Sequence, residues 1–504
     1  MKTHLVNFRW WESNEPQEML IENGRVLWRD TVAGVKAEGA DKVDLGGKIL
    51  IPSYIDSHCH ILPTGLDLQK LDLSPAISHQ DVLGLLRQRH KDQPEGWLLA
   101  VQYDQTKYEG GVHIIADQLN TISTDRPILL RHSSGHASVA NTAALRLAGV
   151  DETTPDPSGG HYGRDAAGRL DGTLFEAAHE HVTHAVPTPT VEEMTDAILR
   201  AGEKMADLGI ACASDMMTGR FDLHRELEAY RRAADSGCRI SMRLYLQWSA
   251  VFGARAKPFD LTQDERLKIS GIKIFSDGAI GSATAAIYGR YSGETPNGVV
   301  LSRRAVDIDH PTREVSGQLM YEPEKLRQMI VTASDAGHQV SVHAIGDYAA
   351  DLVMDGFQAT GDAKRHRLEH AMILSDEQIE RLASLGSYLT FQPEFLMKFG
   401  HSYRRQLGPE RAATLKRTRS VLNAGIPLSF SSDRPIVSGN PRDGIVTAIN
   451  RPEGFDEHES CSLKEAIRAY TSEGAKVNGD GESMGSLKPG MIADYRVITS
   501  LSVL

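Results

Sequence analysis

The chain has 504 residues, of which 40% are hydrophobic and 24% are charged, and this composition excludes a disordered or fibrous protein. Its net charge of -12 is spread along the sequence, and no Lys/Arg-rich run offers a footprint for nucleic acid. No run of about 18 apolar residues could span a membrane, and the start lacks the apolar core of a secretory signal, so we expect a cytoplasmic protein without nucleic-acid or membrane partners.

Both ends of the chain consist of short β-type segments. In residues 1–48, the pair Asn23-Gly24 separates EMLIE from RVLWRD, which is typical of a hairpin turn, and VDLGGKIL follows as a further strand. The C-terminal segment MGSLKPGMIADYRVI has the same character. We therefore predict a small β-sandwich domain built from both termini, residues 1–48 and 480–504.

Residues 49–479 carry the pattern of a barrel domain of alternating strands and helices. From about residue 190 to 436, β-branched runs alternate with helical stretches that begin at capping residues, such as Thr190 with Glu193, and end at glycines such as Gly209. The predicted strands, in order, are ILIPSYIDSHCH, IACASDM, RISMRLYLQ, GIKIFSDG, QVSVHAIGD, RHRLEHA, YLTFQPEF and IPLSFSSD. Eight strands complete a closed parallel barrel, so the fold class is α/β with a (β/α)8 TIM barrel.

The first two predicted barrel strands are separated by roughly 140 residues, which is too long for one βα loop. We expect an inserted subdomain after the first barrel strand, at about residues 61–185. It contains a helix from Gln80, a strand WLLAVQYD, and a segment in which Asn141 caps a further helix.

Five of the predicted barrel strands end in residues that can bind metal ions. His58 and His60 are two positions apart at the end of the first strand, so both imidazoles point to the same face, although an H-x-H pair alone is weak evidence among 20 histidines. Four later strands end in the further candidates Lys273, His343, His370 and Asp433. Active sites of this fold form where the carboxyl ends of different strands meet, so we expect these side chains to converge.

The strings H-x-H, K-I-F-S-D-G, H-A-I-G-D, R-L-E-H-A and S-S-D-R-P, in this order, resemble the amidohydrolase superfamily. More narrowly, the sequence is similar to the YtcJ-like branch, amidohydrolase family 3, which includes N-substituted formamide deformylases. The likeness extends over nearly the whole chain, including PDPSGGHYGRDAAGRLDGTLFEAA, PRDGIVTAINR and GSLKPGMIAD.

The resemblance implies a centre with one or two divalent metal ions, and zinc is the ion expected from the donor types. The ligands it implies are His58, His60, Lys273, His343, His370 and Asp433. In this arrangement Lys273, after carboxylation by carbon dioxide, bridges the two ions, because a desolvated lysine loses its proton readily. The alternative is a salt bridge from Lys273 to the neighbouring Asp277, which would leave a single metal ion.

The function expected from this centre is hydrolysis of a C–N (amide) bond of a small molecule by attack of a metal-bound hydroxide. Asp433 has the best claim to be the general acid/base, although the SSDRP segment could also be an ordinary turn. The same centre could act as a cyclic amidase, a deaminase or an esterase, since the fold hosts many reactions. The alternative to an enzyme is a non-catalytic regulatory or binding protein.

Three residues are candidates for substrate contacts, and each has an ordinary alternative as a surface residue. Glu176 matches an acidic position of the branch, His136 lies in the insertion, and Arg290 lies in a long segment after Lys273. The branch commonly has Asp-Gly-His followed by an aromatic residue, whereas this chain has Ser134-Gly135-His136-Ala137, so any inherited substrate preference is in doubt. A homodimer is expected only from the general frequency of dimers.

Overall fold

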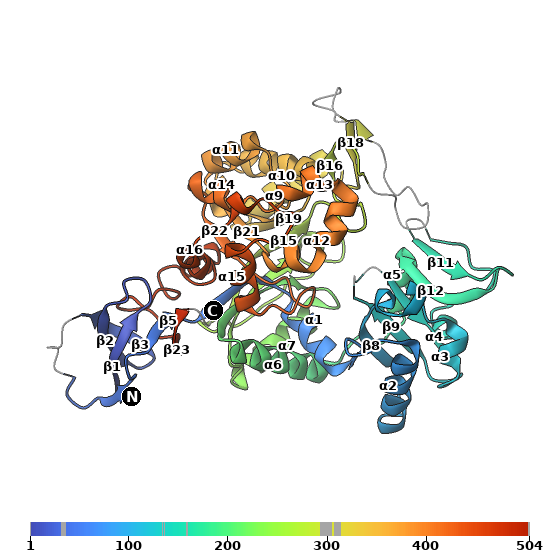
Figure 1. Cartoon of the computed structure of the whole chain (residues 1–504), viewed down its shortest axis with the longest axis horizontal. Coiled ribbons are helices and arrows are strands. Elements are labelled where there is room, and N and C mark those ends of the chain that lie inside the picture. The colour runs from blue at the N-terminus through green and yellow to red at the C-terminus, as the bar shows by residue number, and fades with distance from the viewer. Residues whose placement is uncertain are drawn as a thin grey trace. The chain divides into compact units, whose positions relative to one another are not determined.

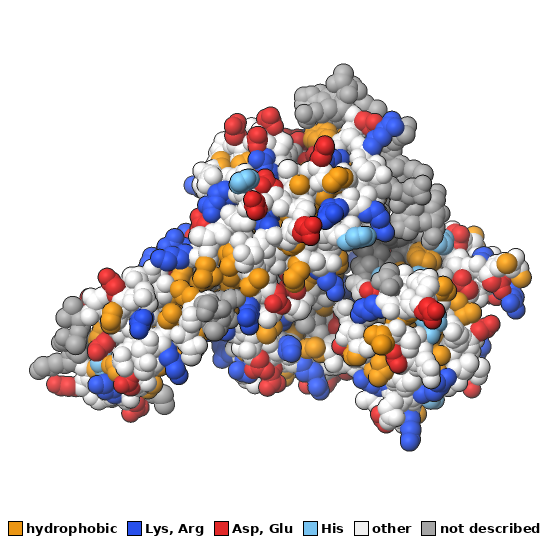
Figure 2. Space-filling model, viewed as in Figure 1, with side chains coloured by type: hydrophobic (Ala, Val, Ile, Leu, Met, Phe, Trp, Pro, Cys, Tyr) orange, Lys and Arg blue, Asp and Glu red, His pale blue; other side chains and the backbone are white. Residues whose placement is uncertain are grey.

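A computed structural model describes residues 2–31, 37–133, 135, 137–157, 160–292, 305–306 and 314–501 (Figure 1). The chain divides into two compact units, one formed by Met1–Ile61 with Gly202–Leu504 and the other by Leu62–Ala201. The domain boundaries expected from the sequence stay a prediction. Within the described residues, every helix is too short or too polar to cross a bilayer. On the face drawn in Figure 2, acidic and basic side chains are interspersed.

Both termini contribute to one six-stranded sheet, as the sequence predicts. Its order is β23-β5-β1-β2-β3, with β4 also paired to β1. The bounds are β1 (Lys2–Trp10), β2 (Pro16–Glu22), β3 (Arg25–Asp30), β4 (Asp41–Asp44), β5 (Ile49–Pro52) and β23 (Tyr495–Ile498). Asn23 and Gly24 join β2 to β3 with φ of 51° and 77°, the two positive values that a tight type I′ hairpin turn requires.

The first unit contains an eight-stranded parallel sheet in the order β22-β21-β20-β19-β15-β14-β13-β6, which confirms the predicted barrel. The strands are β6 (Tyr54–Cys59), β13 (Ile210–Thr218), β14 (Ser241–Gln247), β15 (Leu267–Phe275), β19 (Gln339–Ala344), β20 (Arg367–His370), β21 (Tyr388–Phe391) and β22 (Leu428–Phe430). The barrel closes between β22 and β6, where the Ser57 hydroxyl donates to the Phe430 carbonyl at 3.2 Å and the Asp433 amide donates to the His58 carbonyl at 2.8 Å.

Helices follow the barrel strands in the chain (Figure 1). They are α6 (Val191–Asp207), α7 (Leu223–Asp235), α8 (Trp248–Phe252), α9 (Pro323–Asp335), α10 (Asp347–Ala359), α11 (Asp376–Leu385), α12 (Glu394–Leu407), α13 (Pro409–Ala413), α14 (Thr418–Asn423), α15 (Pro441–Ile449), α16 (Leu463–Ala469) and α17 (Ser472–Val477). The predicted capping residues act as expected: Ser375 and Gln378 form a capping box on α11, and Gly386 ends this helix at φ 67°.

The prediction that ILIPSYIDSHCH forms one continuous strand is wrong, because the structure divides this segment between two sheets. β5 belongs to the terminal sheet and pairs with β23, whereas β6 belongs to the barrel and pairs with β13. Ser53 is the only residue between them, and its amide donates to the Asp494 carbonyl at 2.9 Å. This bond extends the pairing with the β23 segment one residue beyond Pro52, and the chain enters the barrel sheet at Tyr54.

The second unit has its own six-stranded sheet, in the order β11-β12-β10-β9-β8-β7. Its elements are α1 (Ile61–Gln69, which begins at the end of the first unit), β7 (Leu71–Asp72), α2 (His79–Asp92), β8 (Leu98–Tyr103), α3 (Ala116–Asn120), β9 (Ile128–His132), β10 (Ala137–Ala140), α4 (Thr142–Leu147), β11 (Gly160–Arg164), β12 (Leu170–Glu176) and α5 (Ala177–Thr183). Asn141 is the N-cap of α4, as expected, because its side chain accepts from the Ala144 amide at 3.0 Å. A small sheet of β16 (Ile287–Tyr288), β18 (Glu314–Ser316) and β17 (Ala305–Val306) belongs to the first unit.

Candidate metal centre

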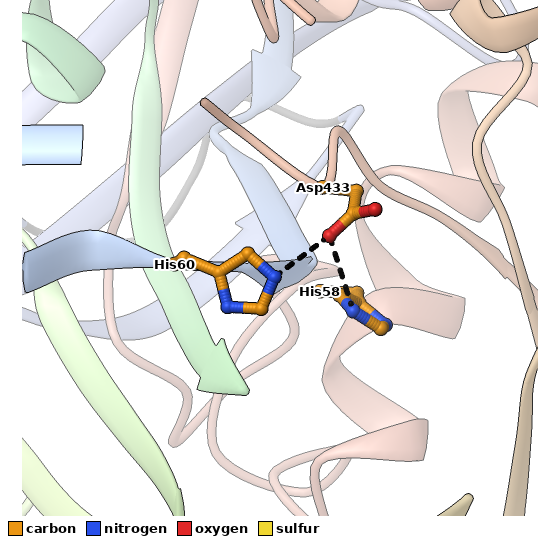
Figure 3. Close-up of side chains that lie close together, drawn as sticks. All are labelled: His58, His60 and Asp433. Carbon is orange, nitrogen blue, oxygen red and sulfur yellow. Dashed lines mark ion pairs between the residues drawn. The ribbon is translucent and has the colours of Figure 1, made fainter. Parts of the chain in front are cut away.

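The structure brings His58, His60 and Asp433 together at the carboxyl ends of β6 and β22. Both imidazoles direct Nε2 toward the same carboxylate oxygen of Asp433, at 3.4 Å from His58 and 2.9 Å from His60 (Figure 3). All three residues are buried. Burial alone raises the pKa of Asp433, but the two adjacent imidazoles outweigh it and hold this pKa well below its usual value.

This cluster has the spacing that a divalent ion needs. Around a tetrahedral zinc ion with ligand bonds of about 2.0–2.2 Å, neighbouring ligand atoms lie about 3.3–3.6 Å apart. The three ligand atoms lie within 4.8 Å of one another, and the distances of 3.4 and 2.9 Å from the two imidazole nitrogens to Asp433 Oδ1 are close to this range. Within the described part of the chain, Asp433 Oδ1 is buried without a hydrogen bond of ordinary geometry. The residues therefore fit a bound cation.

Lys273 lies on β15 beside this cluster, with its Nζ 3.4 Å from His58 Nε2. Burial lowers the pKa of Lys273 to about 8, although the carboxylates of Glu369 and Asp433 act in the opposite direction. The alternative salt bridge to Asp277 does not form, because the Asp277 carboxylate accepts hydrogen bonds from three backbone amides, those of Ala286, Ile345 and Gly346. No carboxylate among the described residues lies within ion-pair distance of Nζ.

His343 and His370 lie next to the cluster, on β19 and β20. The ring centroids are 4.7 Å apart for His58 and His370, and 4.6 Å apart for His370 and His343. His343 Nε2 donates to the Gly278 carbonyl at 3.0 Å, which leaves Nδ1 for another partner. His370 Nδ1 donates to Gln392 Oε1 at 2.8 Å, which leaves Nε2. The five predicted strand ends therefore do converge on one region.

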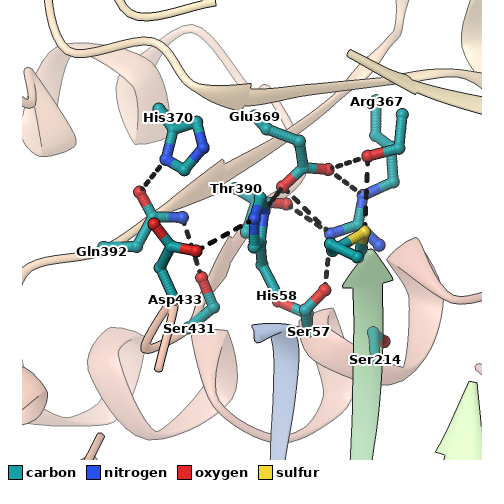
Figure 4. A network of polar contacts seen from close by, with 12 residues as sticks. Ser57, His58, Ser214, Arg367, Glu369, His370, Thr390, Gln392, Ser431 and Asp433 are labelled. Atoms are coloured by element: carbon teal, nitrogen blue, oxygen red, sulfur yellow. Dashed lines mark hydrogen bonds and ion pairs between the residues drawn. The ribbon is translucent and has the colours of Figure 1, made fainter. Parts of the chain in front are cut away.

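His58 is oriented by a buried charge pair that the sequence did not lead us to expect. Its Nδ1 donates to Glu369 Oε2 at 2.5 Å, and Glu369 pairs with Arg367 two positions earlier on β20 (Figure 4). Burial raises the pKa of Glu369, but Arg367, His58 and Lys273 together outweigh it and hold this pKa well below its usual value. With its proton on Nδ1, His58 presents the lone pair of Nε2 to the cluster.

Two of the candidate ligands have a backbone conformation that is unfavourable for their residue type. His370 has φ of 70° and Asp433 has φ of 57°, both in the left-handed region. Such a residue costs about 1 kcal/mol or more, and the cost is tolerated mostly at functional sites. At His370 the turn also lets two successive residues, Glu369 and His370, reach the same region instead of opposite faces of the strand.

Comparison with known proteins now gives the family. Residues 41–500 match the model described as "Amidohydrolase family". The chain belongs to the amidohydrolase family. The YtcJ protein of Bacillus subtilis (strain 168) is 27% identical, with 97% of this chain and 92% of that protein covered. N-substituted formamide deformylase of Arthrobacter pascens is also 27% identical, with 96% and 90% covered.

A solved structure supports the same assignment over the full length. An uncharacterized metal-dependent hydrolase from Pyrococcus horikoshii OT3 superposes with a TM-score of 0.79 at 27% identity, and the match covers 100% of this chain and 99% of that one. The resemblance to YtcJ and to formamide deformylases is thereby confirmed, and the activity of this amidohydrolase falls in the hydrolase class.

The structure places two of the three predicted substrate-contact residues of this amidohydrolase but does not test their role. Glu176 is the last residue of β12 and pairs with Gly160, in the second unit. His136 lies outside the described residues. Arg290 is exposed, and its Nε donates to both carboxylate oxygens of Glu314 at 2.9 Å. The role of all three in substrate binding stays a prediction.

An apolar cluster in the first unit joins segments that follow the carboxyl ends of the barrel strands. Ile280 follows β15, Ile345 follows β19, Met372 follows β20, and Phe395 lies at the start of α12. The Phe395 ring is nearly parallel to the imidazole of His370, with 6.3 Å between centroids. The ligand-bearing ends of this amidohydrolase are therefore held against an apolar layer.

Proposed function

We propose that this amidohydrolase cleaves a C–N amide bond of a small molecule with the help of divalent metal. His58, His60 and Asp433 would hold one ion, and His343 with His370 a second. When bound, an ion of the zinc type polarises the carbonyl oxygen of the substrate and makes water more acidic. The observation that carries the proposal is the pair of imidazole nitrogens on one buried carboxylate oxygen, at 3.4 and 2.9 Å.

Lys273 is proposed to become a carbamate, whose carboxylate oxygens would add to the ligands that hold the metal. The buried amine has a pKa of about 8, so about a tenth of it is neutral at pH 7, far more than for an exposed lysine. The neutral nitrogen forms a bond to the carbon of carbon dioxide and releases one proton, which gives an anionic carboxylate at the end of the side chain. This charge would replace the carboxylate partner that Lys273 does not have among the described residues.

Asp433 is proposed as the general acid/base. Its low pKa keeps the carboxylate ionised at neutral pH, so it can take a proton from water as the water attacks the carbonyl carbon. The same carboxyl group then delivers the proton to the leaving nitrogen, and the C–N bond breaks. His60 Nε2 and the backbone bond from Asp433 N to His58 O fix where this carboxylate lies.

The relative named as an N-substituted formamide deformylase makes an N-substituted formamide the first substrate to test. Ring amides, deaminase substrates and esters are alternatives with the same centre. A small-molecule substrate, cytoplasmic location, a homodimer, and the absence of nucleic-acid and membrane partners stay predictions.

The proposal is tested with protein purified without chelators. We expect at least about one equivalent of tightly bound divalent metal, and turnover of a formamide or linear amide. The Asp433→Asn variant should lose about 10²–10⁴-fold in kcat, the usual contribution of a general acid/base, while the exposed Asp235→Asn variant serves as the matched control. Metal analysis of Asp433→Asn separates lost proton transfer from lost metal. Full activity of this variant, or turnover of esters or ring amides alone, would contradict the proposal.

A further inference from the structure

A chain of hydrogen bonds behind His370 remains without a role in the proposed reaction. Gln392 follows β21 by one residue, and its amide group lies between His370 and Ser431 (Figure 4). Lys416, between α13 and α14, approaches the same amide from another direction, with its Nζ 2.9 Å from Gln392 Oε1. His370, Gln392 and Lys416 are each at most 2% exposed.

The orientation of the Gln392 amide follows from two independent contacts. The atom of Gln392 that faces Lys416 is the amide oxygen, which accepts from Nζ at 2.9 Å. On the other side, the Ser431 hydroxyl donates its one proton to the Phe391 carbonyl at 3.2 Å. Ser431 Oγ must therefore accept from the Gln392 Nε2 group, which lies 3.0 Å away. Both contacts require the same orientation of the amide.

The fixed amide determines which nitrogen of His370 carries the proton. Gln392 Oε1 has no proton to give, so His370 Nδ1, at 2.8 Å, must donate to it. In a neutral imidazole the other nitrogen then has a free lone pair, and only a nitrogen with a lone pair can bind a metal ion. His343 Nε2 is held similarly by the Gly278 carbonyl at 3.0 Å, and it also lies 3.4 Å from Asp277 Oδ1.

The backbone conformation and the burial of Lys416 are both energetically unfavourable. It has φ of 54°, in the left-handed region, and its Nζ also donates to the His370 carbonyl at 3.0 Å. Its Nζ lies over the rings of Phe391 and Phe395, with 4.9 and 5.6 Å to the centroids. Burying a lysine among aromatic rings, with no ion-pair partner among the described residues, is expensive, so a role beyond packing explains its presence better than packing does.

We infer that Lys416 and Gln392 are positioning residues that hold His370 in the tautomer with its proton on Nδ1, so that Nε2 is ready to bind metal. The tautomer can be observed in metal-free protein and does not depend on the reaction. Its consequence, tight binding of the second ion, rests on the proposed function. Loss of a partner that orients a metal-binding histidine typically weakens metal binding 10–100-fold.

The test uses metal-free protein labelled with ¹⁵N in histidine, with the His370 signals identified from their loss in His370→Gln. We expect a protonated Nδ1 and an unprotonated Nε2 in the unmodified protein. Gln392→Leu, which removes the acceptor, should give a mixture of tautomers and bind the second ion 10–100-fold more weakly. Gln392→Glu keeps an acceptor for both His370 and Lys416, so it should retain the tautomer. Lys416→Met, which keeps the apolar stem over the two phenylalanines, should show a smaller shift toward the mixture than Gln392→Leu.

Lys398→Met, at an exposed position of α12, is the control and should leave the spectrum and metal binding unchanged. An unprotonated Nδ1 in the unmodified protein, or a Gln392→Leu spectrum and metal affinity equal to those of the control, overturns the inference. If Gln392→Leu does not fold, the spectra of Gln392→Glu and Lys416→Met test the inference instead. Loss of the Nδ1-protonated tautomer in Gln392→Glu also overturns the inference. Failure of the unmodified protein to bind a second ion would instead contradict the proposed function, while the metal-free spectra still decide the tautomer.

Discussion

Glu369→Gln removes the charge from the buried pair that orients His58. Arg367 and Glu369 are both fully buried, and removing one partner of such a pair leaves an uncompensated charge that typically costs 3–5 kcal/mol. In the variant, Arg367 keeps hydrogen bonds to the Ser57 carbonyl at 2.7 Å and to the Thr390 hydroxyl at 3.0 Å. We therefore expect the loss of unfolding free energy to lie at the low end of this range, about 3 kcal/mol. Metal binding through His58 should also weaken 10–100-fold.

The control is Glu324→Gln, which removes the same charge from an exposed pair. Glu324 lies 2.8 Å from Arg327 with both side chains about half exposed, and pairs of this kind contribute about 0–1 kcal/mol. Urea unfolding of the metal-free proteins, followed by circular dichroism, gives the loss of unfolding free energy without a contribution from bound metal. Equal losses in Glu369→Gln and Glu324→Gln would refute the assignment of the buried pair as an essential support of β20.

Three further predictions concern parts of the structure away from the candidate ligands. Burial raises the pKa of Glu226 to about 7, so the carboxyl group loses its proton at lower pH in the unfolded chain than in the folded one, and the free energy of unfolding falls as the pH rises from about 4.5 to 7. The Glu226→Gln variant should therefore gain up to about 3 kcal/mol of stability relative to the unmodified protein across this range. Parallel pH profiles of urea unfolding for the two proteins would contradict this expectation. Gly65→Ala would place a Cβ 1.8 Å from the Ala197 carbonyl oxygen and should destabilise the chain by about 1–3 kcal/mol, whereas Gly84→Ala, with open space and a position inside α2, should stabilise it by about 0.5–1 kcal/mol in the same unfolding assay. Asn141→Ala should cost about 2–3 kcal/mol because it removes a cap and leaves buried backbone groups without partners, and an unchanged unfolding midpoint would show that this cap is dispensable.

The sequence predicted the barrel and the convergence of the ligands because both depend on local patterns. The two-residue spacing of His58 and His60, and the alternation of strands with capped helices, need no knowledge of distant contacts. The division of the first strand at Ser53 could not be predicted in this way, because nothing local to ILIPSYIDSHCH distinguishes a strand of one sheet from a strand of another. Their pairing partners separate them: β5 pairs with β1 and with β23, more than 400 residues later, whereas β6 pairs with β13.

The residues that orient the ligands were missed for a related reason. Glu369 contacts His58 across 311 positions of sequence, and Lys416 contacts Gln392 from a segment without regular structure. One local signal was available: Arg367 and Glu369 are two apart on a barrel strand, so both face the same side, where opposite charges would pair. The left-handed backbone of His370 gave no signal at all, since this conformation favours glycine or asparagine.

The pairing of β5 with β23 has a consequence for how the protein is made. The ribosome makes β1 to β5 well before β23, so the outer edge of β5 has no neighbour until Tyr495–Ile498 emerge, more than 400 residues later. The barrel likewise cannot close until β22 has been made, since β22 is the strand that lies against β6. Until these partners are made, the nascent chain carries open strand edges, and chaperones that cover these edges would reduce aggregation.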